Sequence, residues 1–362
     1  MKQKYYKNSS ERQKKVPMII LMIVIITLLL VLGGVFQKNY QKKYAVTVND
    51  EEKKENVDQV SQDPPSTEEP EPAMELYLCD QGYFTTHDTE SYLFIGTDAS
   101  GNTETVGEEY RGAMADFLLL AVVDHTDESY GFLQLNRDTM SEITLLQADG
   151  SGYASAELQL CTAHWYGGDE KASCENTVEA VSYLLGEVPI DGYYALDMKA
   201  IPKINHEVGG VAVTIEDDFS DSDPTLVQGT TVLLNDEQAY HYIHDRMNVG
   251  DGENVSRMRR QKAYMDALGE KVREKQKEDQ QFVLRMLQNL QDDSVTDLDL
   301  NRLAGSLQEI NHYRSTGVHQ IEGTTRLGQA LGDGLDHTEF YPDEESLKEQ
   351  MIRLYSLEEL QE

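Results

Sequence analysis

The chain is poor in basic residues, in cysteine and in tryptophan. Its 362 residues include 31 Lys and Arg against 65 Asp and Glu, which gives a formal net charge of −34. A chain this acidic lacks the basic surface that gains free energy by releasing counterions from DNA or RNA, so we expect no nucleic-acid partner. The three cysteines show none of the Cys-x-x-Cys spacing of zinc or redox sites. A His-Glu-x-x-His zinc motif, a phosphate-binding P-loop and a Gly-x-Ser-x-Gly elbow are also absent from the sequence.

Residues 16–36 form an uncharged apolar run of 21 residues. This is long enough to cross about 30 Å of hydrocarbon as a helix, and no Ala-x-Ala cleavage site follows it. We therefore predict a retained transmembrane helix, with cleavage as the alternative. Residues 1–15 carry six basic residues and one Glu, a net charge of +5, which leaves −39 for the rest. The excess of basic residues predicts a cytoplasmic tail at 1–15 and an extracellular C-terminal part.

Residues 37–88 are rich in Glu, Asp, Pro, Ser and Gln and have few large apolar side chains. We predict a disordered acidic linker here, because such a segment buries too little apolar surface to fold. We predict that residues 89–356 form one α/β domain.

Apolar runs in that domain alternate with helical patterns. Strands are predicted at 91–96, 117–124, 130–136, 192–197, 209–216 and 318–323, and helices at 154–166, 174–186, 198–208, 254–277, 280–290, 297–312 and 343–355. The run at 117–124 is continuously apolar, as expected of a strand covered on both faces. The predicted fold class is a layered αβα domain with a central mixed β-sheet.

Cys161 and Cys174 leave two alternatives open. A disulfide between them would close a 14-residue loop and contribute about 3 kcal/mol in the chain-entropy model. Two free, buried thiols are the other reading. His164 lies between them on a predicted amphipathic helix, so we expect a packed histidine rather than a metal ligand.

Charged residues gather where apolar elements end, and ligands of layered α/β sheets bind at strand ends. Asp98 follows the first strand, Asp116 precedes the second, and Arg137 and Asp138 follow the third. Two carboxylates among arginines suit Mg²⁺ and a pyrophosphate, so Asp98 and Asp116 are candidate metal ligands. A fourth group contains His244, Arg246, Asp251, Arg257, Arg259, Arg260 and Gln261. Within it, helical spacing predicts Arg257, Arg260 and Gln261 on one face, with Arg259 in solvent.

At these residues the chain resembles the LytR-CpsA-Psr family of bacterial cell-envelope proteins. The shared motifs are a Gly-x-Asp loop at 96–98, an Asp opening a buried strand at 116, and Arg-Asp-Thr at 137–139. They continue with Tyr-Gly-Gly at 166–168, Val-Gly-Gly-Val at 208–211 and Arg-x-x-Arg-Gln at 257–261. The order and spacing of these short motifs extend from about residue 90 to near the C-terminus.

The resemblance implies a membrane-anchored phosphotransferase. Such proteins move a glycopolymer, such as teichoic acid or capsular polysaccharide, from a polyprenyl-pyrophosphate carrier onto peptidoglycan with the help of Mg²⁺. The lipid tail would lie in an apolar tunnel between the sheet and the helices. The residues implied are Asp98 and Asp116 for metal; Arg137, Asp138, Arg246 and Asp251 for catalysis; and Arg111, His244, Arg257, Arg260 and Gln261 for pyrophosphate. Asp138 is expected to orient a neighbouring arginine.

Three positions depart from the family pattern. An Arg expected two residues before Asp116 stands five before it, as Arg111, and His244 replaces the first member of an Arg-x-Arg pair. A Lys-Ile-Asn element appears as Gln159-Leu160-Cys161. Weaker pyrophosphate binding, a different glycopolymer, or a non-catalytic scaffold that binds lipid-linked polymer or cell wall are the alternatives that these changes leave open.

Overall fold

The computed structural model describes residues 72–98, 113–147, 149–166, 169–279, 282–298 and 313–361. The predicted tail at 1–15, the span at 16–36, most of the helix at 297–312 and Arg111 lie outside these ranges. Within them, no helix is both long and apolar enough to cross a membrane.

A six-stranded mixed sheet forms the centre of the domain, in the order β11-β8-β3-β4-β5-β12. Strand β4 is antiparallel to both β3 and β5, while β8 is parallel to β3 and β12 is parallel to β5. This confirms the predicted α/β class with a central mixed sheet. The strands are β3 (Thr89–Thr97), β4 (Ala115–Asp124), β5 (Ser129–Leu135), β8 (Gly192–Asp197), β11 (Ser294–Thr296) and β12 (Arg314–Gln320).

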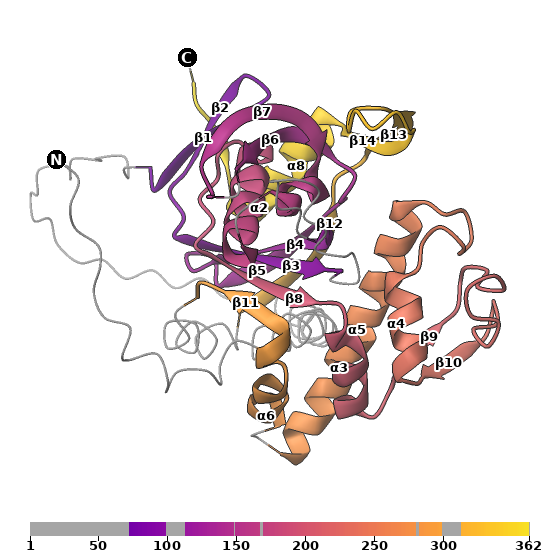
Figure 1. Ribbon diagram of the computed structural model, residues 1–362. Coiled ribbons are helices and arrows are strands. Elements are labelled where there is room, and N and C mark those ends of the chain that lie inside the picture. Colours follow the sequence, from indigo (N-terminus) through magenta and orange to yellow (C-terminus); the bar gives the residue numbers. More distant parts are fainter. Residues whose placement is uncertain are drawn as a thin grey trace, which may run out of the picture.

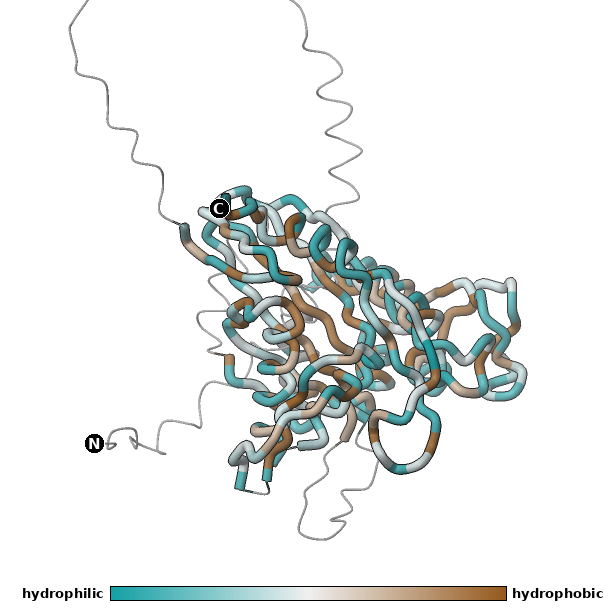
Figure 2. Tube along the Cα trace, turned by 90° about the horizontal axis from the view of Figure 1, so that it is seen from above, coloured by the Kyte–Doolittle hydropathy of each residue, from teal (hydrophilic) through white to brown (hydrophobic). Residues whose placement is uncertain are grey.

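The middle strands are apolar because helices cover both faces. On β4, Leu118, Leu120 and Val122 join one core cluster, and the alternate residues Leu119 and Val123 join another on the opposite face. Hydrophobic segments, brown in Figure 2, gather toward the middle of the trace, while the outer loops are mostly hydrophilic. A four-residue turn at 125–128 connects β4 to β5, as the hairpin pattern predicts.

Two groups of helices complete the three layers (Figure 1). One face packs against α2 (Glu170–Leu184) and α8 (Glu344–Tyr355). On the other side lie α3 (Ala200–Val208), α4 (Asp236–His244), α5 (Asn254–Glu278) and α6 (Phe282–Asn289). The long α5 runs beneath the sheet, and it carries Arg257 and Gln261 at its N-terminal end.

Smaller elements surround this core. They are β1 (Met74–Leu78), β2 (Gln81–Thr85) and β15 (Glu358–Glu359) in one sheet; the pairs β6 (Met140–Leu146) with β7 (Gly152–Gln159), β9 (Val211–Thr214) with β10 (Thr231–Leu234), and β13 (Gly323–Gly328) with β14 (His337–Pro342); and the 3₁₀ helices η1 (Leu160–Trp165) and η2 (Gln291–Asp293).

Two sequence predictions are wrong in this region. The predicted linker to residue 88 extends too far, because β1 and β2 pair within it and bury Leu76, Leu78 and Tyr83 in the main core. The predicted helix at 154–166 is instead β7 followed by η1. Pairing of β7 with β6 satisfies its backbone groups and overrides the helical propensity of its Ala, Glu and Leu residues.

The cysteines are free thiols, and the disulfide alternative is wrong. Cys161 and Cys174 are buried, while Cys79 is exposed. His164 is packed as expected, although on η1: its Nδ1 lies 2.8 Å from the carbonyl oxygen of Ala113 and its Nε2 lies 3.6 Å from Cys174 Sγ.

We expect one thiol to react with Ellman's reagent in the native protein, and three in denaturant without reductant. Burial shields Cys161 and Cys174, and it also raises the pKa of each thiol, which lowers the thiolate fraction that reacts. Only one reactive thiol in the denatured, unreduced chain would show that the disulfide forms after all.

Candidate functional site

Three strand ends meet at one edge of the sheet. Because β3 and β5 are both antiparallel to β4, the end of β3, the start of β4 and the end of β5 lie together. Asp98 directly follows β3, Asp116 is the second residue of β4, and Arg137 lies two residues beyond β5. The sheet topology therefore brings together three residues that are far apart in sequence.

Asp116 lies between two arginines. Nη1 of Arg137 and Nη1 of Arg257 both donate to its Oδ1, the latter at 3.1 Å. Arg257 is only 3% exposed, and burial lowers its pKa to about 10, so the guanidinium stays charged at neutral pH. Asp116 alone does not balance the two arginines, and Asp138, whose Oδ1 lies 3.6 Å from Arg137 Nε, supplies a second negative charge.

Arg137 has hydrogen-bonding capacity that the protein does not fully use. Its Nη2 lies 2.9 Å from Sγ of Cys161, and a thiol sulfur is a weak acceptor. Its buried Nε has no hydrogen-bond partner among the described residues, because the nearest Asp138 oxygen is 3.6 Å away. An anionic oxygen would satisfy this guanidinium better than the thiol does.

Asp138 holds a third arginine. Nη1 of Arg246 donates to Asp138 Oδ2 at 3.0 Å, and the Asp138 carboxylate is almost completely buried. This geometry matches the expectation that Asp138 orients a neighbouring arginine. It also brings Arg246 close to Arg137, because Asp138, which binds Arg246, directly follows Arg137 in the chain.

His244 bridges two carboxylates. Its Nε2 lies 3.0 Å from Asp98 Oδ2 and its Nδ1 lies 3.1 Å from Asp245 Oδ1. The hydrogen bond with Asp245, followed by that with Asp98, raises the pKa of His244 above its ordinary value, although burial opposes the shift. The ring also stacks on Tyr240 at 4.7 Å. A histidine with both nitrogens facing carboxylates favours the imidazolium form, so position 244 supplies a cation here.

Two asparagines that the sequence reasoning missed connect the sheet to α5. Nδ2 of Asn254 donates to Oδ1 of Asn136 at 2.7 Å, and Oδ1 of Asn254 accepts from Nε and Nη2 of Arg257 at 3.1 and 2.8 Å. Their positions in the sequence could have indicated this role, because Asn136 directly follows β5 and Asn254 is the first residue of α5.

Arg260 does not join the cluster, contrary to the prediction. Its buried guanidinium donates to Asp217 at 2.7 Å and to the carbonyl oxygen of Tyr242 at 3.0 Å, and it lies over the ring of Phe219. Arg259, expected in solvent, is 51% exposed but also binds Asp217, at 2.7 Å. Arg260 lies only about 60° around α5 from Arg257 but about 4.5 Å further along the helix axis, and from there its guanidinium binds Asp217.

Asp251 is also placed differently from the expectation. Its exposed carboxylate accepts from Ser256 Oγ at 2.8 Å and from the backbone N–H of Glu253 at 2.9 Å. These bonds shape the loop before α5, and in the described part of the structure Asp251 forms no hydrogen bond or ion pair with Arg137, Arg246 or Arg257.

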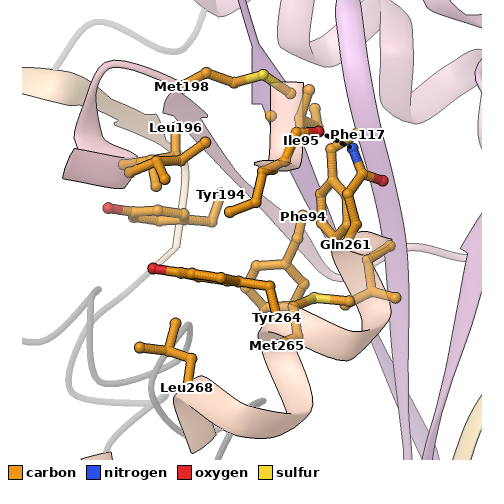
Figure 3. Close-up of a pocket in the computed structure, with 14 residues that line it drawn as sticks. Phe94, Ile95, Phe117, Tyr194, Leu196, Met198, Gln261, Tyr264, Met265 and Leu268 are labelled. Atoms are coloured by element: carbon orange, nitrogen blue, oxygen red, sulfur yellow. Dashed lines mark hydrogen bonds between the residues drawn. The ribbon is translucent and has the colours of Figure 1, made fainter. Parts of the chain in front are cut away.

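An apolar cavity of about 130 Å³ lies between the sheet and α5 (Figure 3). Phe117 follows Asp116, and Ile243 precedes His244, so the cavity wall and the charged cluster share strand and helix ends. Gln261 contributes a polar side chain at this junction, next to Phe117. The remaining lining residues come from β3, β4, β8, α3 and α5: Phe94, Ile95, Gly96, Leu119, Tyr194, Leu196, Met198, Ile201, Tyr264, Met265 and Leu268.

The pKa of His244 gives a pH prediction. The pKa of His244 in the folded protein is raised above its ordinary value of 6.5. The protonated ring therefore contributes fully to the free energy of unfolding below about pH 6.5, and this contribution is lost as the pH rises through the pKa of the folded state. NMR titration of labelled histidines should show His244 titrating above 6.5, and Asp245→Asn should lower that value. His319, whose pKa burial lowers, is an internal reference. A His244 pKa at or below that of His319 would contradict the prediction.

Comparison with known proteins supports the pattern of motifs. The model of the LytR_cpsA_psr family matches residues 34–354. Bacillus subtilis TagV, a polyisoprenyl-teichoic acid–peptidoglycan teichoic acid transferase, is 29% identical over 184 residues, which cover 49% of this chain and 42% of TagV. TagU of Halalkalibacterium halodurans, named as the same kind of transferase, is 25% identical over 181 residues, 50% of this chain and 52% of TagU. The chain thus matches about half the length of these curated relatives.

Solved structures share the fold. The crystal structure of B. subtilis TagV has 19% identity and a TM-score of 0.54, covering 74% of this chain and 96% of TagV. TagT bound to LI-WTA has 21% identity and a TM-score of 0.52, with 74% and 90% covered. Protein gbs0355 of Streptococcus agalactiae has 18% identity and a TM-score of 0.56, with 74% and 87% covered. Because the sequence identities to these structures are only 18–21%, the similarity establishes the fold and nothing further. With a family model that spans most of its length, the chain belongs to the LytR-CpsA-Psr family.

Proposed function

We propose that this protein is a membrane-anchored phosphotransferase that attaches a glycopolymer from a polyprenyl-pyrophosphate carrier to peptidoglycan. The observation that carries the proposal is the apolar cavity directly beside a cluster of cations, which suits a ligand with an apolar tail and an anionic head group. The names of TagV and TagU support a teichoic acid or a similar glycopolymer as the cargo, and a capsular polysaccharide is the other candidate.

The reaction would transfer a phosphoryl-linked glycan. An acceptor hydroxyl of peptidoglycan attacks the phosphorus that carries the glycan, the bridging P–O bond of the pyrophosphate breaks, and polyprenyl phosphate leaves. Negative charge grows on the leaving phosphate, so fixed cations lower the barrier. Arg137, Arg246 and Arg257 would provide these charges, and His244 would replace the guanidinium that the family pattern expects at its position.

Asp98 and Asp116 are the residues that would hold Mg²⁺. Carboxylate oxygens are its preferred ligands, and Mg²⁺ completes its shell with water and phosphate oxygens. The donor types fit, although Asp116 Oδ1 faces two arginines and Asp98 Oδ2 faces His244. When bound, the ion would neutralise charge on the pyrophosphate. In the described ranges, His87, Asp124 and Asp127 also approach one another, but Asp124 already accepts from His87 and Ser356.

The placement relative to the membrane rests on the sequence. The predicted span at 16–36 would anchor the chain with residues 1–15 in the cytoplasm and the α/β domain outside, beside the lipid carrier and peptidoglycan. The strong negative charge of the chain fits a domain without nucleic-acid partners.

Replacing Arg137 by Ala should lower turnover of a polyprenyl-pyrophosphate-linked glycan by about 100-fold, because one preorganised donor to the growing charge is lost. The measurement is release of polyprenyl phosphate by the purified full-length chain. Arg353→Ala is the matched control, since Arg353 is 54% exposed on α8 and, among the described residues, forms an ion pair with Glu349 alone. Lipid binding by the unmodified protein with no turnover would instead support the non-catalytic scaffold.

Removal of Mg²⁺ by EDTA should abolish turnover, and added Mg²⁺ should restore it. Asp98→Asn should raise the Mg²⁺ concentration needed for half-maximal turnover, because an amide oxygen is a weaker ligand than a carboxylate. The measurement is turnover against Mg²⁺ concentration. Undiminished turnover in EDTA would refute the assignment of Asp98 and Asp116.

A further inference from the structure

Three glutamines form a continuous chain of hydrogen bonds across the domain. Nε2 of Gln320 on β12 donates to Oε1 of Gln134 on β5 at 2.8 Å, and Nε2 of Gln134 donates to Oε1 of Gln261 on α5 at 3.2 Å. Gln134 is buried and lies on the same strand face as Tyr130 and Phe132. A glutamine in this otherwise apolar row has no role in packing that Leu or Met would not fill as well.

Two backbone carbonyls, one beside Gln134 in the middle and one beside Gln261 at the α5 end, fix the direction of this chain. The second N–H of Gln134 donates to the carbonyl oxygen of Met258 at 3.4 Å, and a carbonyl only accepts. Nε2 of Gln134 must therefore face α5, which requires the oxygen of Gln261 to face Gln134. The amide nitrogen of Gln261 then points the other way, where it donates to the carbonyl oxygen of Ile243 at 3.4 Å.

This direction decides what Gln261 offers to a ligand. Its oxygen accepts from Gln134, and of its two N–H groups one donates to Ile243 while the other has no hydrogen-bond partner among the described residues. Gln261 lines the cavity beside Phe117, and Arg257 lies one turn before it on α5. An N–H at this place attracts an anionic oxygen, whereas an amide oxygen would repel it.

We propose that Gln134 is a positioning residue that makes Gln261 present its N–H, not its oxygen, to the pyrophosphate of the carrier lipid. The proposal rests on the proposed function, because it takes the head group of that substrate as the ligand of Gln261. Gln134 acts through Gln261 and does not itself touch the substrate.

The test compares two probes on the full-length protein: farnesyl pyrophosphate and farnesol, which share the apolar chain. Gln134→Glu offers only acceptors toward Gln261, so the amide should reverse and the preference for pyrophosphate over alcohol should fall by about 10- to 100-fold. Gln134→Met leaves Ile243 alone to orient the amide and should reduce the preference less. Affinity for farnesol should stay constant, since the apolar wall is unchanged.

Gln320→Met is the matched control. It removes one link of the chain, but Met258 still fixes the direction of Gln134, so the preference should equal that of the unmodified protein. An unchanged preference in both Gln134 variants, or an equal loss of affinity for both probes, would overturn the positioning role. If the unmodified protein shows no preference for farnesyl pyrophosphate, the proposed function itself fails, which is a distinct result.

Discussion

The carboxylate of Asp116 is the interaction on which the rest of the site depends. One oxygen accepts from Arg137 beyond the end of β5 and from Arg257 on α5, while Asp116 itself opens β4. Three elements are thereby tied at one point. Without this shared anion, two guanidiniums would lie together in a largely buried place with only Asp138, 3.6 Å from Arg137, to compensate them, which costs far more than an exposed pair.

Cations gather at this point in a chain of net charge −34, each beside a carboxylate. Arg137 and Arg257 share Asp116, Arg246 pairs with Asp138, and His244 lies between Asp98 and Asp245. The adjoining cavity is lined almost wholly by apolar side chains. A ligand with a polar head group and an apolar tail would therefore place its head group at the charged cluster and its tail in the cavity. Both surfaces are formed by the same strand and helix ends.

His244 and Cys161 show how a departure from a family pattern changes the physics without removing the site. An imidazolium between two carboxylates replaces a guanidinium, so its charge depends on pH where an arginine's would not. A buried thiol next to Arg137 is a weaker acceptor than an amide oxygen, and it leaves the guanidinium less fully bonded. Both changes concern how strongly cations are held, and both leave them in place.

The sequence by itself determined the α/β class, the buried central strands, and Asp98, Asp116, Arg137 and Asp138 as strand-end residues, because apolar runs and the charges that end them are local features. It misjudged 154–166, where pairing with the preceding strand β6 overrides local propensity, and it set the domain boundary after β1 and β2, whose burial depends on partners elsewhere. It also grouped Arg260 with Arg257. Only the tertiary structure decided that Arg260 binds Asp217, that Asn136 and Asn254 join sheet to helix, and that Gln134 sets the direction of Gln261. The reason is physical: hydrogen bonds between residues 43 to 127 positions apart are specified by how sheet, loop and helix pack, and no local pattern of residues encodes them.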